Sequence, residues 1–152
     1  MDDMMLRVMR LGASGLYCSQ IIMALALETR GEENPALVRS LAGLAFGCGT
    51  GQASCGVLSG GACVLALYAG KAPGEEESPA LMPLLQEFGE WFAANAGGEN
   101  GGVTCAAILG EGTPRVTQQK CGELVAAAFG RILELLAAHG FDPTNPEQAH
   151  AY

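Results

Sequence analysis

The feature that most constrains the fold is a long stretch without charge. Residues 40–70 contain no charged side chain, and a glycine-rich segment, residues 47–54, interrupts them. The apolar part after the interruption, residues 55–70, has 16 residues. A helix of that length is about 24 Å long, short of the roughly 30 Å core of a bilayer. We therefore expect residues 55–70 to form the buried central helix of a bundle, with a glycine-rich loop before it.

The rest of the chain has helical periodicity and few strand signals. Apolar residues recur at helical spacing in five further segments, which are residues 4–11, 15–30, 35–46, 79–94 and 121–139. Ser14, Asn34 and Ser54 are candidate N-caps. Because 152 residues suffice for one domain with a real core, the sequence predicts a single domain, residues 1–152. We expect an all-α bundle of five or six helices, with residues 141–152 as an extended tail.

Charge excludes several kinds of partner. The net charge is −8, which disfavours nucleic acid and anionic membrane surfaces as partners. The first residues lack the basic-then-apolar order of a signal peptide, which predicts a cytoplasmic protein. Only 6% of the residues are aromatic and 22 are glycine, so a homodimer would usefully add buried apolar area.

Six cysteines follow none of the familiar spacings. The chain has no C-x-x-C pair, which argues against a thioredoxin-type dithiol and a zinc ribbon. It also lacks the C-x-x-C-H haem motif and the ferredoxin runs. In a cytosolic protein, cysteines are more often metal ligands, catalytic groups or redox sensors than structural disulfides.

Four of the cysteines are expected at helix starts, which are Cys18, Cys55, Cys105 and Cys121. The first turn of a helix carries free backbone N–H groups and the positive end of the helix dipole. Such a position lowers a thiol's pKa and makes the sulfur a better nucleophile and metal ligand. We therefore expect the four to converge on one site. The alternative is that each is a buried small hydrophobe.

Several glycines lie close to these cysteines in the sequence, where the backbone carries no side chain. Three of them are expected to adopt left-handed conformations and offer amides to sulfur, and they are Gly47, Gly49 and Gly51. Gly56 and Gly60 are four residues apart, which favours close packing of another helix. Cys48 is either a fifth sulfur near the site or a plain thiol, and Cys63 is expected to point off the face of Cys55.

Four motifs together resemble the C_GCAxxG_C_C family of redox-active proteins. They are Cys18-Ser19-Gln20, "FGCGTGQASCGVLSG", "CAAILG" and "KCGELV", and the resemblance covers about residues 6–138. The family's characteristic cysteines fall on Cys18, Cys55, Cys105 and Cys121. This chain departs from the family at Cys48, where glycine is usual, and Cys63 is extra. The resemblance implies a small helical redox protein. A similar domain occurs beside cytochrome-type haem modules, which links these cysteines to an iron–sulfur cluster.

Three hypotheses follow for the site. In the first, the four cysteines are metal ligands of a [2Fe–2S] or [4Fe–4S] cluster for electron transfer or redox sensing, and a redox protein is the partner. Residues near that cofactor would be Gly47, Cys48, Gly49, Gly51 and Gly56. In the second, the same four are the redox-active thiols of a metal-free thiol–disulfide oxidoreductase or sensor. The third is a structural zinc site in which all four ligands are cysteines.

Overall fold

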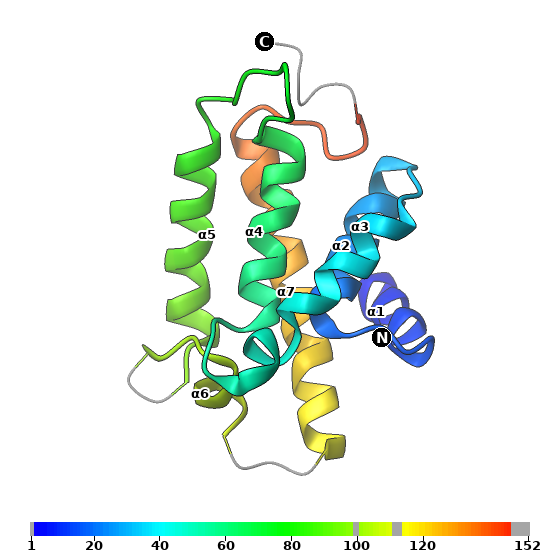
Figure 1. The fold of residues 1–152 in the computed structure, drawn as a ribbon, viewed down its shortest axis with the longest axis vertical. Coiled ribbons are helices and arrows are strands. Elements are labelled where there is room, and N and C mark those ends of the chain that lie inside the picture. Colours follow the sequence, from blue (N-terminus) through cyan, green and yellow to red (C-terminus); the bar gives the residue numbers. More distant parts are fainter. Residues whose placement is uncertain (1, 99–100, 111–113, 147–152) are drawn as a thin grey trace.

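The computed structural model describes residues 2–98, 101–110 and 114–146, with backbone only for residues 114–117. The predicted all-α class is confirmed (Figure 1). The helices are α1 (Asp3–Ala13), α2 (Cys18–Arg30), α3 (Pro35–Ser40), α4 (Gly56–Ala69), α5 (Leu81–Ala96), α6 (Cys105–Leu109) and α7 (Pro114–Ala138). Within these ranges there are seven α-helices, one more than the upper expectation of six, and the short helix α6 is the addition.

Helix ends follow local chemistry, with one shift. Asn34 caps α3 by accepting a hydrogen bond from the Leu37 N–H, as predicted. Gly31 ends α2 in a left-handed conformation with φ 70°. Ser14 was expected to cap α2, but it lies at the end of α1, because Gly15 turns the chain there with φ 99°.

Helices α2 and α4 form the most extensive contact of the bundle. Every residue from 19 to 27 in α2 is buried, so this helix is enclosed on all sides. A Cβ atom on Gly60 would lie 3.0 Å from Ile22 Cγ2 and 3.2 Å from Ser19 Cα. The expectation that Gly56 and Gly60 admit a neighbouring helix is therefore confirmed, and that helix is α2. The close crossing brings the start of α2 against the start of α4.

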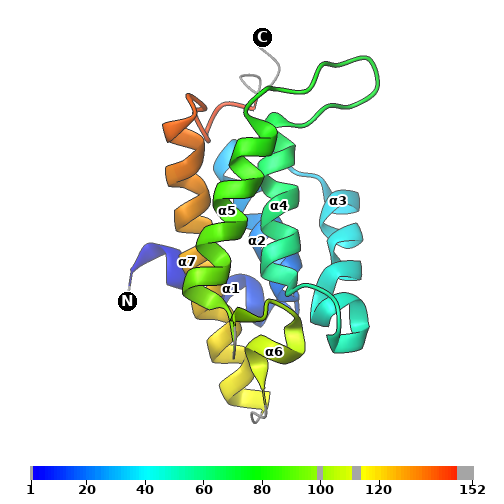
Figure 2. The same cartoon turned by 90° about the vertical axis from the view of Figure 1, so that its left-hand side faces the viewer.

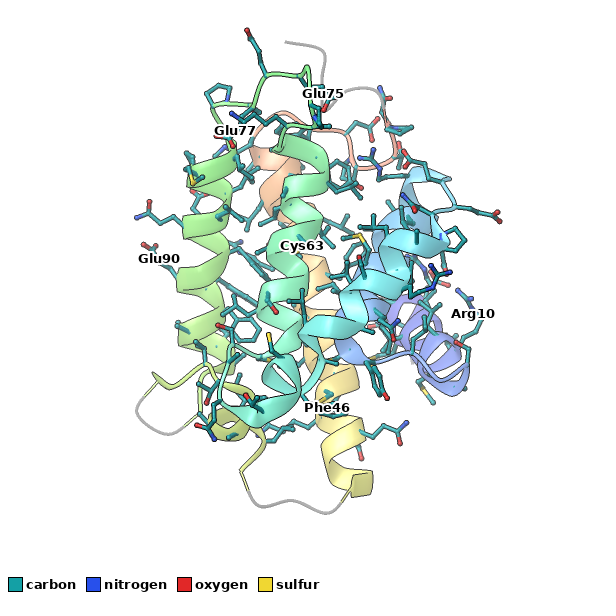
Figure 3. All side chains as sticks on the ribbon, viewed as in Figure 1. Arg10, Phe46, Cys63, Glu75, Glu77 and Glu90 are labelled. Carbon is teal, nitrogen blue, oxygen red and sulfur yellow. The ribbon has the colours of Figure 1, made fainter. Side chains whose placement is uncertain are left out.

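Helix α4 has a central place but one open face. It packs against α2, α5 and α7, and Figure 2 shows α5 and α7 on the side away from α3. Phe88 and Phe92 of α5, together with Phe129 of α7, are buried in the core that α4 shares. Cys63, midway along α4, is exposed on the open face (Figure 3).

The chain after α7 packs on the helices. Phe141 is 4% exposed, and the Tyr68 hydroxyl donates a 2.7 Å hydrogen bond to the Pro143 carbonyl. The Arg30 guanidinium lies over the Tyr68 ring and donates to the Pro146 carbonyl. The rest of the predicted tail, residues 147–152, lies outside the described residues. None of the helices, over the residues described, has the length and apolar character needed to cross a membrane.

Candidate functional site

A single antiparallel bridge places Cys55 beside Cys105. It pairs Ser54 with Thr104, and the Cys105 N–H donates a 3.1 Å hydrogen bond to the Ala53 carbonyl. In return, the Cys55 N–H donates a 2.8 Å hydrogen bond to the Val103 carbonyl. Both cysteines directly follow the bridged pair, so their side chains lie on the same face of it. Both are nearly enclosed, at 5% and 9% exposure.

Helix starts position these two thiols much as predicted. Thr104 caps α6 by accepting a hydrogen bond from the Ala107 N–H, so Cys105 is the first residue of that helix. Cys55 itself is the N-cap residue of α4, one position later than the predicted cap Ser54. The backbone N–H groups of Val57 and Leu58, in the first turn of α4, act on the Cys55 thiol and lower its pKa.

Cys18 reaches the same place from α2. It is the first residue of that helix, and the Ser19 N–H acts on its thiol and lowers the pKa. A Cβ atom built on Gly56 would lie only 3.1 Å from Cys18 Sγ. The bare Gly56 backbone therefore leaves the room that the Cys18 sulfur occupies next to Cys55.

Cys121 joins the site from a different kind of position. The sequence predicted that Cys121 opens the last helix, and this is wrong, because α7 begins at Pro114. Proline is favoured in the first turn of a helix, so the helix already starts at Pro114, before the predicted segment 121–139. Cys121 lies two turns inside α7, where its own helix start offers no free N–H group.

All four thiols interact with one another. The charges of Cys55, Cys121 and Cys105 each raise the pKa of Cys18, and those of Cys55 and Cys105 raise the pKa of Cys121. The charge of Cys105 also raises the pKa of Cys55. Every one of the six possible pairs is therefore coupled, so the four thiols lie near one another, whereas their role as one functional site stays a prediction. Figures 1 and 2 show α6, the helix that begins with Cys105, at one end of the bundle.

The predicted lowering of the thiol pKa values is wrong. Burial is the largest cause for every one of the four, and it raises the pKa of Cys18 to about 12 and that of Cys121 to about 11. The pKa values of Cys55 and Cys105 are also raised by burial. The N–H groups at Cys18 and Cys55 oppose this effect, but desolvation and mutual repulsion outweigh them. The four thiols are therefore protonated at neutral pH.

The glycine-rich loop contacts the site at one end only. Gly47, Gly49 and Gly51 have φ values of 60°, 80° and 77°, which confirms the predicted left-handed conformations. A Cβ atom on Gly47 would lie 2.7 Å from the Ala53 carbonyl oxygen and 3.2 Å from Cys105 Cβ. One on Gly51 would lie 3.9 Å from Ala106 Cβ, whereas the position at Gly49 is open. Among the proposed cofactor glycines, Gly47 and Gly56 thus lie against the cysteines.

The two remaining cysteines lie apart from this cluster. Cys48 and Cys63 are exposed, and neither takes part in the couplings among the four thiols over the residues described. Cys48 adopts a left-handed φ of 55° inside the loop.

Two neighbours of the site were not found from the sequence. Tyr17, directly before Cys18, meets Phe46 edge-on with ring centroids 5.3 Å apart, and both rings are about half exposed. Lys120, directly before Cys121, interacts with that thiol and lowers its pKa. The only sequence signal for either was adjacency to a cysteine.

The chemistry of the four thiols favours metal binding, whereas their arrangement in the structure does not. Four thiols are soft donors of the kind that iron–sulfur clusters and zinc require. Within the residues that the structure describes, no group of three or more His, Cys, Asp or Glu side chains is arranged so that it could hold a metal ion. Metal binding by Cys18, Cys55, Cys105 and Cys121 therefore stays a prediction.

These features define a class, a small helical protein with four mutually coupled cysteines at one end of a bundle. The chain belongs to the family described as "Putative redox-active protein (C_GCAxxG_C_C)", whose model matches residues 16–135. The match includes all four clustered cysteines. No curated protein and no solved structure matches the chain.

Proposed function

We propose that this redox protein transfers electrons or senses redox state through an iron–sulfur cluster held by Cys18, Cys55, Cys105 and Cys121. The observation that carries the proposal is the electrostatic coupling of all six pairs among these thiols. The family supports a redox role, and the donor set supports iron.

The raised pKa values explain why a cation suits this site. Four thiolates close together in a buried place repel one another, so the free protein keeps them protonated. Iron ions would bind the thiolate form in exchange for the protons, and their positive charge would offset the repulsion among the sulfurs. Loading with iron should therefore release protons and become more favourable as the pH rises.

The chain's own groups would then hold and tune the site. A bound cluster supplies one-electron chemistry. The N–H groups of Val57 and Leu58 stabilise negative charge on the Cys55 sulfur, and the Ser19 N–H does so for Cys18. Gly56 leaves space for the Cys18 sulfur.

The test is a measurement of iron and acid-labile sulfide per chain, with a visible spectrum, on protein purified without oxygen. We expect two or four irons with equal sulfide in the wild type, and loss of the visible band in Cys55→Ser. Cys63→Ser is the matched control, because Cys63 lies on the same helix but is exposed and outside the cluster. A Cys55→Ser protein with an unchanged spectrum would show that Cys55 is not a ligand.

A second candidate is a metal-free thiol–disulfide protein. Its support is that all four thiols are free and that Cys55 and Cys105 lie on the same face of one bridged pair. Two thiols would form one disulfide, with two protons released and two electrons passed to an oxidant. Iron-free, zinc-free protein whose thiol count falls reversibly by two or four on oxidation would favour this candidate. Zinc in a one-to-one ratio would instead indicate a structural site.

We further propose that the electron partner is a protein with a basic docking surface, since the net charge here is −8. The homodimer and the cytoplasmic location stay predictions.

A further inference from the structure

Lys120 joins two of the helices that carry the clustered thiols. It directly precedes Cys121 on α7, and its Nζ atom donates a hydrogen bond to the carbonyl oxygen of Ile108. Ile108 lies in the short helix α6, which begins with Cys105. This one side chain therefore ties the helix of Cys105 to the helix of Cys121.

Lys120 also brings charge to the cluster. Its bond to Ile108 holds the ammonium group between α6, which begins with Cys105, and α7, which carries Cys121. A cationic group therefore lies between the helices that carry two of the four thiols.

We propose that Lys120 is a positioning residue of the redox site, whose bond to Ile108 fixes α6 against α7 and whose ammonium group favours the reduced form. The proposal rests on the function proposed above. When the site takes one electron from a reductant, its charge becomes more negative by one unit. A positive group nearby stabilises the product more than the reactant, so its removal should lower the reduction potential.

The experiment compares the reduction potentials of the wild type and four variants, measured anaerobically by titration with dithionite and followed by the visible spectrum. Lys120→Met removes both the charge and the donor, and Lys120→Gln removes the charge but keeps an N–H donor. Lys120→Arg keeps both the charge and the donors. Lys71→Met is the control, because it changes the net charge equally at the opposite end of α4 from Cys55.

We expect Lys120→Met and Lys120→Gln to lower the reduced-to-oxidised ratio about tenfold at a given potential, equal to about 59 mV for one electron. The reduction potential of Lys71→Met should equal that of the wild type, and the potential of Lys120→Arg should lie close to it. Potentials of Lys120→Met and Lys120→Gln equal to that of Lys71→Met would overturn this inference and leave the cluster in place. Wild-type protein without iron would instead refute the proposed function, and this inference with it.

Discussion

A methyl group added at Gly47 tests how the glycine-rich loop supports the cysteines. Gly47 has φ 60°, and a Cβ atom there would lie 2.7 Å from the Ala53 carbonyl oxygen. That oxygen accepts the Cys105 N–H hydrogen bond. The Gly47→Ala methyl group would therefore press on the bridge that sets Cys105 beside Cys55.

The cost has two parts. A left-handed conformation costs an alanine about 1–2 kcal/mol. Crowding in a packed interior adds about 1–3 kcal/mol. We expect Gly47→Ala to lower the free energy of unfolding by about 2–5 kcal/mol.

Gly49→Ala is the matched control, because Gly49 has φ 80° but open space around its Cβ position. It carries the backbone cost without the crowding. The smaller entropy of the unfolded alanine chain applies to both variants and cancels in their difference. Gly47→Ala should therefore be less stable than Gly49→Ala by about 1–3 kcal/mol.

The assay is equilibrium unfolding in urea, followed by far-ultraviolet circular dichroism under reducing conditions and extrapolated linearly to water. Equal stabilities of Gly47→Ala and Gly49→Ala would refute the reasoning, because they would show that the loop yields at Gly47 without disturbing the bridge. A second readout is the rate at which Cys105 reacts with a thiol reagent, which should rise in Gly47→Ala alone.

Two further predictions use the same unfolding assay. Tyr68→Phe removes the 2.7 Å hydrogen bond to the Pro143 carbonyl and should cost about 1 kcal/mol, and no loss would show that the segment after α7 does not depend on that bond. In metal-free protein, burial and neighbouring thiols raise the pKa of Cys18 from 9.0 to about 12. The unfolded chain therefore loses this proton at a lower pH, so stability is full below about pH 9 and falls as the pH rises toward 12. Cys18→Ala should reduce that fall between about pH 8 and 10 while the exposed Cys48→Ala does not, and equal slopes would contradict the assigned cause.

Local chemistry made several features readable from the sequence. Gly31 and Asn34 end and begin helices through a left-handed residue and a side-chain cap, which are properties of a few neighbouring residues. Gly47, Gly49 and Gly51 adopt positive φ for the same local reason. The selection of four cysteines out of six also came from the sequence, through predicted helix starts and the resemblance to a family.

Cys121 shows where local reasoning failed. The periodicity predicts a last helix that starts at residue 121, whereas Pro114 is suited to a helix start and begins α7. Cys121 nevertheless lies among the other three thiols, because the packing of α7 brings it there. Its place was predicted correctly from a premise that was wrong.

The sequence by itself determined the helical class and the glycine turns, because each depends on short-range periodicity or backbone freedom. Tertiary structure alone decided that Cys18 Sγ lies by Gly56, that Lys120 links α6 to α7, and that the thiol pKa values are raised. Desolvation and the repulsion among sulfurs depend on distances between segments far apart in the chain. The predicted helix starts indicated backbone N–H groups that lower a thiol pKa. Only the packed bundle shows that burial raises the pKa by more.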